Sequence, residues 1–289
     1  MKKQELVIEE RDFEPKHIFE CGQCFRWNIE SDMSYTGVVK NNIINVRKQD
    51  NKIIFKGMFF DDINKICADY FKLDIDYGNF KKILAIKDKT LKESIEYGYG
   101  IRILSQDLWE TVISFIISAN NNIPRIKRII EKLSKTYGNK MIWNGKEYYT
   151  FPTPEQLSKA SVEDLRKVGL GFRDKRVYET TRKIINKEII LENLEKIKDE
   201  NLLRQELMKL DGVGEKVADC IMLFSTLNRK EVFPVDVWVR RVMNDLYIKS
   251  DDENKISKVE IRKLAKDKFG DLAGIAQQYL FYWRREKRI

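Results

Sequence analysis

A lysine follows directly on a glycine turn in the stretch LDGVGEKVADC, residues 210–220. Gly212 and Gly214 permit backbone angles that other residues adopt only at a cost, so they predict a tight turn. The apolar residues that follow predict a helix with Lys216 in its first turn. The positive end of the helix dipole disfavours a further positive charge there, so we expect it to lower the pKa of the amine. An amine with a lowered pKa is available as a nucleophile or for a Schiff base.

The same turn has the form of a phosphate-binding site. Leucines recur at helical spacing before it, so helix, GVG turn and helix follow one another over about residues 200–227 in the pattern of a helix–hairpin–helix. Backbone N–H groups at such a turn approach a phosphate oxygen, and the helix dipole favours the anion. Two alternatives stay open: the hairpin only packs against the rest of the protein, or Lys216 is a phosphate-binding surface lysine.

A carboxylate follows in FPVDVW, residues 233–238. Pro234 and Val235 precede Asp236, and the helical run VWVRRVMNDL follows it, so Asp236 is predicted to cap a helix. A capping carboxylate accepts backbone N–H bonds, which favour its charged form. Beside a nucleophilic lysine, it would stabilise positive charge that develops on a sugar. The alternative is an ordinary helix cap.

The elements that position these residues change character along the chain. SYTGVV, NIINVRK and NKIIFKG predict an antiparallel meander, and DINKICADYFKL predicts a helix after it. Helical spacing then dominates, beginning with a helix capped by Ser105 that ends at the asparagines 120–122. The predicted fold class is α+β, with an N-terminal antiparallel sheet domain over residues 1–100 and an all-helical body over residues 101–289.

Composition limits the kind of partner. Lys and Arg number 54 against 45 Asp and Glu, and the net charge of +9 suits a polyanion such as nucleic acid, although a lysine-rich protein without such a partner would look the same. Cys21 and Cys24 form one CxxC pair, but no second cluster joins them, and His17 is the single histidine, so no metal site is predicted. The sequence has no long apolar run of the kind that would predict a signal peptide or a membrane span. We therefore expect a cytoplasmic protein.

Several motifs together carry a resemblance to a known family. LDGVGEKVADC followed by FPVDV resembles the helix–hairpin–helix, Gly/Pro…Asp (HhH-GPD) superfamily of DNA glycosylases. The finer resemblance is to the 8-oxoguanine DNA glycosylase branch of this superfamily. Five further motifs look like the signatures of that branch and occur in the same order: CGQCFRW (21–27), ISANNNIPRI (117–126), FPTPEQL (151–157), VGLGFRDKRV (168–177) and AQQYLF (276–281). The resemblance implies an N-terminal antiparallel sheet domain, a helical body with the hairpin, and an enzyme that flips its target base out of the duplex.

The resemblance assigns the chemistry to two residues and the base pocket to four. Lys216 matches the nucleophile that attacks the sugar and forms the Schiff base, and Asp236 matches the essential carboxylate. The backbone carbonyl of Gly22 matches the acceptor for the N7 proton, which 8-oxoguanine has and guanine lacks. Cys220 and Phe281 match the pair that sandwiches the base. Gln277 matches the residue that reads its Watson–Crick edge.

Further residues match contacts with the rest of the DNA. Asn120 matches the residue that fills the gap left by the flipped base, and Arg125 and Arg173 match the arginines on the unpaired cytosine, with Phe172 wedged beside them. Without the resemblance, the asparagines would be a polar helix stop and Phe172 a core aromatic.

The remaining predicted contacts are with phosphates. Gly212 and Gly214 match the phosphate-binding hairpin. Trp238 stands where the branch often has a histidine near the DNA backbone, so an indole N–H would replace that contact. The basic tail FYWRREKRI is given only a diffuse phosphate role.

The predicted protein is a monomeric base excision repair enzyme that acts on double-stranded DNA, associated with the nucleoid in a prokaryote. It excises 8-oxoguanine opposite cytosine, and its lysine Schiff base then cuts the strand by β-elimination. No metal or organic cofactor is predicted. Two alternatives remain: a related glycosylase with another lesion specificity, and a non-enzymatic DNA-binding protein that uses the hairpin as a phosphate clamp.

Overall fold

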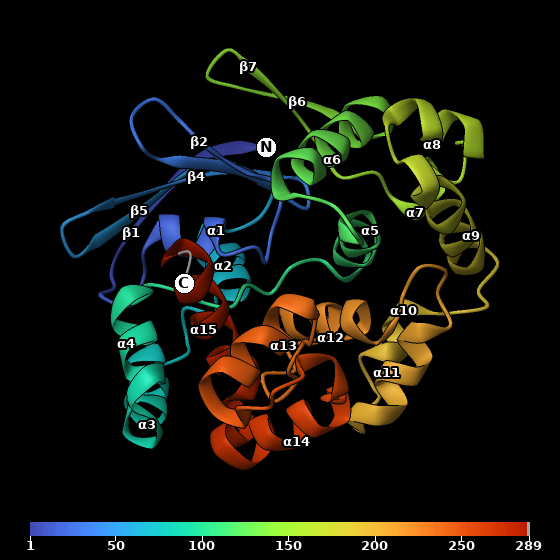
Figure 1. The fold of residues 1–289 in the computed structure, drawn as a ribbon. Coiled ribbons are helices and arrows are strands. Elements are labelled where there is room, and N and C mark those ends of the chain that lie inside the picture. The colour runs from blue at the N-terminus through green and yellow to red at the C-terminus, as the bar shows by residue number, and fades with distance from the viewer. Residues whose placement is uncertain (288–289) are drawn as a thin grey trace.

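A five-stranded antiparallel sheet forms the N-terminal part of the chain, with the spatial order β1-β5-β4-β3-β2 (Figure 1). The computed structural model describes residues 1–287. The strands are β1 (Lys2–Glu9), β2 (Trp27–Ile29), β3 (Tyr35–Val39), β4 (Asn42–Gln49) and β5 (Lys52–Phe59). The predicted meander is β3, β4 and β5, and it is confirmed. The first and last strands of the sheet are additions that the sequence pattern did not predict.

One face of the sheet is covered by two helices, α1 (Pro15–Glu20) and α2 (Ile63–Phe71). Phe19 of α1 stacks on Trp27 with 4.0 Å between ring centroids, and Phe55 of β5 lies 5.1 Å from Phe71 of α2. The helix predicted from DINKICADYFKL is α2. This aromatic core includes Trp27, the last residue of the CGQCFRW segment, and so anchors that end of the segment to the sheet.

The rest of the chain is mainly helical. It consists of α3 (Tyr77–Lys87), α4 (Lys89–Tyr97), α5 (Leu108–Ser118), α6 (Ile123–Tyr137), β6 (Lys140–Trp143), β7 (Lys146–Tyr149), α7 (Pro154–Leu157), α8 (Val162–Val168), α9 (Asp174–Ile185), α10 (Leu191–Leu194), α11 (Glu200–Met208), α12 (Glu215–Phe224), α13 (Val237–Met243), α14 (Lys258–Phe269) and α15 (Ala273–Lys287), with short 3-10 and π segments between them. Within residues 1–287, no helix has the length and apolar character needed to cross a membrane.

The predicted α+β class is confirmed, but the body is not all-helical. The hairpin β6–β7 interrupts it between α6 and α7, and Met141 of this hairpin packs with Val38 and Ile43 on the second face of the sheet. That contact explains why every residue of β3 is buried. The division of the chain at about residue 100 stays a prediction.

The helix α5 begins later than predicted. Asp107, not Ser105, caps it, because the Asp107 carboxylate accepts the N–H of Glu110 at 2.9 Å. The preceding residue, Gln106, is held in a parallel bridge to Ser225 and therefore cannot join the helix. α5 is buried along nearly its whole length and packs on α6, α9 and α12, so it forms the centre of the helical body.

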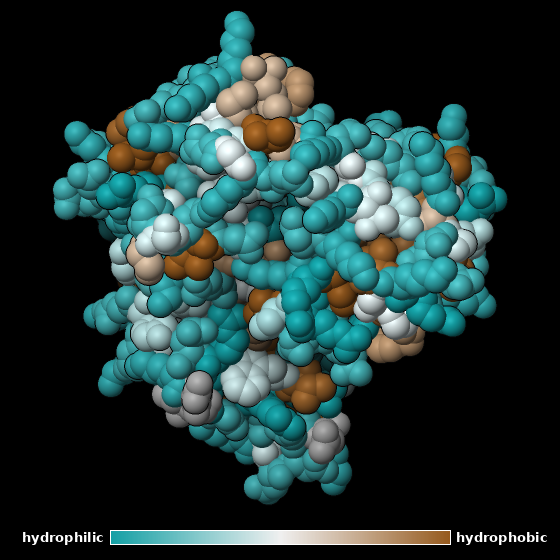
Figure 2. Space-filling model, turned by 90° about the horizontal axis from the view of Figure 1, so that it is seen from above, coloured by the Kyte–Doolittle hydropathy of each residue, from teal (hydrophilic) through white to brown (hydrophobic). Residues whose placement is uncertain are grey.

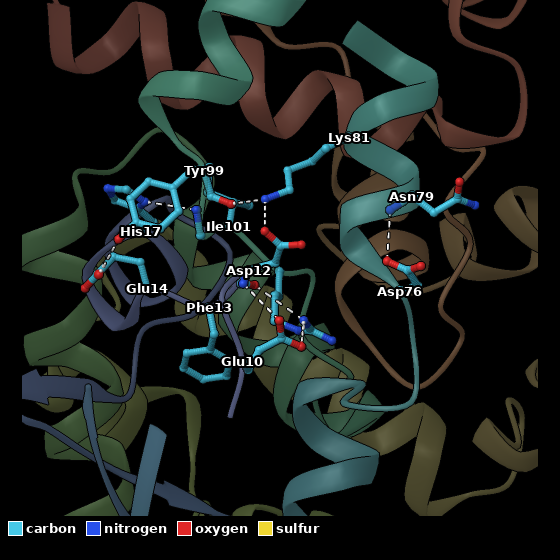
Figure 3. A network of polar contacts seen from close by, with 12 residues as sticks. Glu10, Asp12, Phe13, Glu14, His17, Asp76, Asn79, Lys81, Tyr99 and Ile101 are labelled. Atoms are coloured by element: carbon cyan, nitrogen blue, oxygen red, sulfur yellow. Dashed lines mark hydrogen bonds and ion pairs between the residues drawn. The ribbon is translucent and has the colours of Figure 1, made fainter. Parts of the chain in front are cut away.

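Polar contacts join the sheet to the helices at several points. Figure 3 shows Lys81 of α3 bound to the Asp12 carboxylate and to the Tyr99 carbonyl, with His17 of α1 beside Tyr99. The fully buried Arg102 donates to the backbone carbonyls of Phe71, Lys72 and Ile75.

The last helix returns to the beginning of the chain. Figure 1 shows α15 running from the α13–α14 region toward α1, and it packs against α4 on the way. The buried side chain of Gln278 donates to the carbonyl of Cys21 at 2.7 Å, across 257 positions of sequence. The sheet and the helical body therefore meet at α15.

Candidate active site

The glycine hairpin between α11 and α12 contains two glycines with different roles. Gly212 has a φ of 84°, and a Cβ there would lie 2.9 Å from Cδ of Arg176, so backbone angle and space both require glycine. Gly214 has an ordinary φ of −93°, and no atom would lie within 4 Å of its Cβ. It is exposed at the N-cap of α12 and offers no side chain to cap the helix. The open backbone amides there suit a phosphate oxygen.

Lys216 lies in the first turn of α12 and points inward. Its Nζ is 5.6 Å from the centroid of the Phe115 ring, and the residue lines a cavity together with Asp236. Cys220, one turn later, and the nearby Asp236 carboxylate raise the pKa of the Lys216 amine, while burial acts to lower it. The expected lowering of this pKa is therefore wrong, because the effect of these neighbours outweighs that of burial. The amine must lose a proton before it can act as a nucleophile.

Asp236 caps α13, as predicted. Its Oδ1 accepts the N–H of Val239 at 2.8 Å, and the residue lines the same cavity as Lys216. No donor in residues 1–287 forms a hydrogen bond with Oδ2. The cap thus holds one oxygen and leaves a carboxylate oxygen for the cavity.

The cavity also gathers the four residues assigned to the base pocket: Gly22, Cys220, Gln277 and Phe281. Burial raises the pKa of the Cys220 thiol to about 11, so at physiological pH the thiol is neutral, and the carboxylate of Asp236 supplies the negative charge beside Lys216. Oε1 of the buried Gln277 has no hydrogen-bond partner in the described chain. The cavity holds about 50 Å³, enough for only a few water molecules, so entry of a purine requires the lining of the cavity to move.

Gly22 has a φ of 89°, and a Cβ there would lie 3.4 Å from Nη1 of Arg285. Across residues 1–287, no protein donor forms a hydrogen bond to the Gly22 carbonyl. Two residues that line the pocket, Gly22 and Gln277, therefore each carry an oxygen acceptor without a partner in the described chain.

A larger cleft of about 670 Å³ opens from the pocket. Lys216, Asp236, Asn120 and Trp238 line it, at the ends of α5, α12 and α13. Figure 2 shows a mostly hydrophilic face, hollowed near its centre, on which the apolar patches are small and separate. Such a surface suits a polar partner rather than an extended apolar one.

The residues assigned to the space left by the flipped base also come together. Asn120 is exposed just after α5 with a φ of 49°, a left-handed angle that asparagine tolerates better than most residues. The Phe172 ring is 56% exposed and has the guanidinium groups of Arg173 and Arg176 at 4.2 and 5.2 Å from its centroid. Arg125 is exposed and lies beside Gly171: its Nη2 is 3.9 Å from the point that a Cβ added to Gly171 would occupy.

Arg173 is engaged within the protein. Its guanidinium is buried and donates to the carbonyls of Ala119 at 2.8 Å and Asn120 at 2.7 Å. In this arrangement it stabilises the turn that presents Asn120. Its contact with an unpaired cytosine stays a prediction.

Comparisons with known proteins place this geometry in a family. The model of the N-terminal domain of 8-oxoguanine DNA glycosylase matches residues 5–112, and the model of HhH-GPD superfamily base excision DNA repair proteins matches residues 113–269. This chain belongs to the 8-oxoguanine DNA glycosylase family of the HhH-GPD superfamily.

Individual proteins agree with this assignment. The N-glycosylase/DNA lyase of Saccharomyces cerevisiae is 30% identical over 96% of this chain and 84% of its own length. MBOgg1, solved with a low-affinity DNA ligand, is 44% identical with a TM-score of 0.93 and covers 100% of both chains. The 8-oxoguanine glycosylase/lyase of Clostridium acetobutylicum was solved with double-stranded DNA containing cytosine opposite 8-oxoguanine. It is 40% identical with a TM-score of 0.91, over 98% of this chain and 99% of that chain.

In this glycosylase, Trp238 does not offer its N–H to the cleft. The side chain is partly buried, and Nε1 is buried without a hydrogen-bond partner in the described chain. A contact from the indole N–H to a phosphate stays a prediction. Arg240 and Lys258 line the same cleft and extend its basic surface. Both follow shortly on a helix cap, but basic residues are common along this chain, so the sequence did not single them out.

The basic tail of the glycosylase is largely occupied by the protein itself. Arg284 forms an ion pair with Asp245 at 2.6 Å, and Arg285 donates to the carbonyl of Glu20. The predicted phosphate contacts of Arg288 fall outside the described residues. A diffuse phosphate role for the tail remains a prediction.

Proposed function

We propose that this glycosylase flips out and excises 8-oxoguanine paired with cytosine in double-stranded DNA, and then cuts the strand through Lys216. One observation carries the proposal: a single cavity gathers an amine, a carboxylate oxygen and two acceptors without partners. Within the proposal, the enzyme acts as a monomer, in the cytoplasm.

Recognition of the damaged base rests on the Gly22 carbonyl. The N7–H of 8-oxoguanine donates to this oxygen, whereas guanine would present a lone pair to it. Leaving an enclosed acceptor unsatisfied costs about 1–3 kcal/mol, which disfavours guanine by roughly 5- to 150-fold in this one contact. Gln277 supplies its Oε1 to an N–H of the Watson–Crick edge, and the Phe281 ring and the Cys220 thiol enclose the two faces of the base.

The chemistry proceeds through a covalent intermediate. After losing its ammonium proton, Nζ of Lys216 attacks C1′ of the sugar. The bond from C1′ to N9 breaks, and its electron pair leaves with the base, which takes up a proton. The carboxylate of Asp236 stabilises the positive charge that builds up on the sugar.

The lyase step follows from the same nitrogen. The sugar ring opens to an imine between Nζ of Lys216 and C1′, which makes the protons on C2′ acidic. Loss of one of them breaks the bond from C3′ to its oxygen, so the strand is cut on the 3′ side. Across the duplex, Asn120 fills the gap in the stack, and Arg125 and Arg173 bind the unpaired cytosine.

The proposal is tested with a labelled duplex that carries one 8-oxoguanine opposite cytosine. We expect the wild type to cut the strand and to be trapped covalently by borohydride. Lys216→Gln is expected to lose at least about 10³-fold in excision, as when a covalent nucleophile is removed, and to form no adduct.

Two other results would overturn parts of the proposal. If the wild type were trapped only with duplexes carrying other damaged bases, the lesion specificity would be wrong. If it neither cut nor was trapped with any damaged duplex, and Lys216→Gln bound undamaged DNA more weakly, the hairpin would be a phosphate clamp without chemistry.

A further inference from the structure

The carbonyl of Gly22 lies between two carbonyls that are already hydrogen bonded. The carbonyl of Cys21 accepts from Nε2 of Gln278 at 2.7 Å, and that of Gln23 accepts from Nε2 of Gln106 at 2.7 Å. Both donors are buried. Across residues 1–287, the Gly22 carbonyl is the one of the three that no protein group binds.

A further donor binds the carbonyl of Glu20, the residue before Cys21. The guanidinium of Arg285 donates to the carbonyl of Glu20, and it lies 5.5 Å from the centroid of the Phe281 ring. Arg285 therefore touches both sides of the base pocket: the segment before Gly22 and the aromatic wall.

Both of these donors come from α15, which also carries two of the pocket residues. Gln277, Phe281 and Arg285 are spaced four residues apart, which places them along one face of the helix, and Gln278 is adjacent. Any movement of α15 relative to the Cys21–Gly22 peptide would change the distance between the two free acceptors of the pocket.

We propose that Gln278 and Arg285 are positioning residues for recognition of the damaged base. A glycine with a φ of 89° has wide backbone freedom, so nothing in Gly22 itself fixes the direction of its carbonyl. By holding the carbonyls of Cys21 and Glu20, the two side chains keep these groups away from the pocket and leave Gly22 to accept the N7 proton. A hydrogen bond weakens steeply when its angle is poor, so this restraint sets the rate at which a damaged base is accepted. The inference rests on the proposed function.

The test separates recognition of the base from chemistry on the sugar. Gln278→Met and Arg285→Met remove the donors with little change in volume. They are assayed in single-turnover reactions on a duplex with 8-oxoguanine opposite cytosine and on a duplex with a preformed abasic site. The abasic site contains no base to recognise, yet it still needs Lys216.

We expect both variants to lose roughly 10–100-fold in 8-oxoguanine excision, the size of loss caused by misplacing a reacting group by about 1 Å. Cleavage and borohydride trapping at the abasic site are expected to stay within about twofold of the wild type. Arg285→Lys, which keeps a donor within reach of the Glu20 carbonyl, is expected to recover part of the excision rate.

Arg229→Met is the matched control. Arg229 also donates to a backbone carbonyl, that of Ile197, but it lies outside the pocket, so both reactions should be unchanged. Wild-type excision rates in both test variants would overturn the inference. So would a parallel loss of both reactions together with a lower melting temperature, because that would indicate a purely structural role. A wild type that cleaves abasic sites without excising 8-oxoguanine would overturn the proposed function, and this inference with it.

Discussion

The catalytic pair and the base pocket share one cavity, but the protein builds them in different ways. Lys216 and Asp236 are twenty positions apart, and each stands at the beginning of a helix. The pocket instead joins Gly22 to α15, through a contact that spans 257 positions. Local signals therefore place the catalytic pair, whereas the pocket depends on how the ends of the chain pack. We expect substitutions in the pair to abolish chemistry and distant substitutions to weaken recognition selectively.

After Lys216→Gln, the largest effect should come from the carboxylate of the catalytic pair. Asp236→Asn keeps an oxygen to cap α13 but removes the negative charge from the cavity. Excision is expected to fall by roughly 10²–10³-fold, as when a stabilising group is lost from a transition state. Single-turnover excision of 8-oxoguanine measures it.

Asp199→Asn provides a matched control, because Asp199 caps α11 in the same way, accepting the Leu202 N–H at 2.7 Å. It should leave excision unchanged. Equal losses in the two variants would mean that the cap, and not the charge of Asp236, matters.

The next effect concerns the wall of the pocket. Cys220→Phe would place a ring in a cavity of about 50 Å³ and exclude the base. Excision of 8-oxoguanine should be almost lost, while affinity for undamaged DNA, measured by fluorescence anisotropy, stays close to that of the wild type. Cys220→Ser, of similar size, should retain much more excision. If the phenylalanine variant excised normally, the pocket would lie elsewhere.

A smaller effect separates the two hairpin glycines. Gly212→Ala forces a φ of 84° on alanine and a contact of 2.9 Å with Arg176, so it should destabilise the fold by about 1–2 kcal/mol, measured by urea unfolding. Gly214→Ala meets no atom within 4 Å and should cost no more than about 1 kcal/mol, as a changed cap.

If Gly214 receives a phosphate, its alanine variant should nevertheless weaken binding of undamaged duplex DNA. If Gly214→Ala bound DNA as tightly as the wild type, the prediction that Gly214 contacts a phosphate would be wrong. The comparison thus tests whether one glycine serves the fold and the other serves the ligand.

The smallest effect should be a dependence of the free energy of unfolding on pH, caused by His17 near the Gly22 segment. His17 precedes the Gly22 segment, and its Nδ1 accepts the N–H of Gly100 at 3.3 Å. Burial lowers the pKa of His17 below its ordinary value of 6.5, with Glu14 opposing the shift and Lys16 and Lys48 adding to it. The unfolded chain therefore takes up the proton first as pH falls.

The neutral His17 thus contributes stability above about pH 6.5, and this contribution is lost as pH falls through the lowered pKa. The difference in free energy of unfolding between wild type and His17→Gln, measured in urea, should shrink from pH 7.5 to pH 5.5. A constant difference would contradict the assignment.

Part of the fold could be predicted from short stretches alone. Strands β3 to β5, the helix α2, the glycine hairpin and the cap at Asp236 depend on neighbouring residues, and all of them are confirmed. The hairpin β6–β7 was also within reach: Asn144 and Gly145 both have positive φ, and Asn-Gly between apolar and aromatic residues is a strong turn signal. It was missed because helical spacing dominates the surrounding chain.

Other features follow only from the packed structure. Asp107 replaces Ser105 as the cap of α5 because a bridge between Gln106 and Ser225 delays the helix. The pKa of Lys216 is raised by Cys220, which lies one turn later in the same helix, and by Asp236, which only folding brings beside it. The bridge at Gln106 and the place of Asp236 beside Lys216 cannot be obtained from the local sequence.

Residue types and local spacing thus determined the reactive groups of this glycosylase: a lysine after a glycine turn and an aspartate at a helix cap. Their surroundings were decided by tertiary contacts, above all by α15 against the Cys21–Gly22 peptide. The physical reason is range. Caps and turns are stabilised by hydrogen bonds over three or four residues, whereas a free carbonyl between two bound ones requires donors from distant parts of the chain, Gln106 and Gln278.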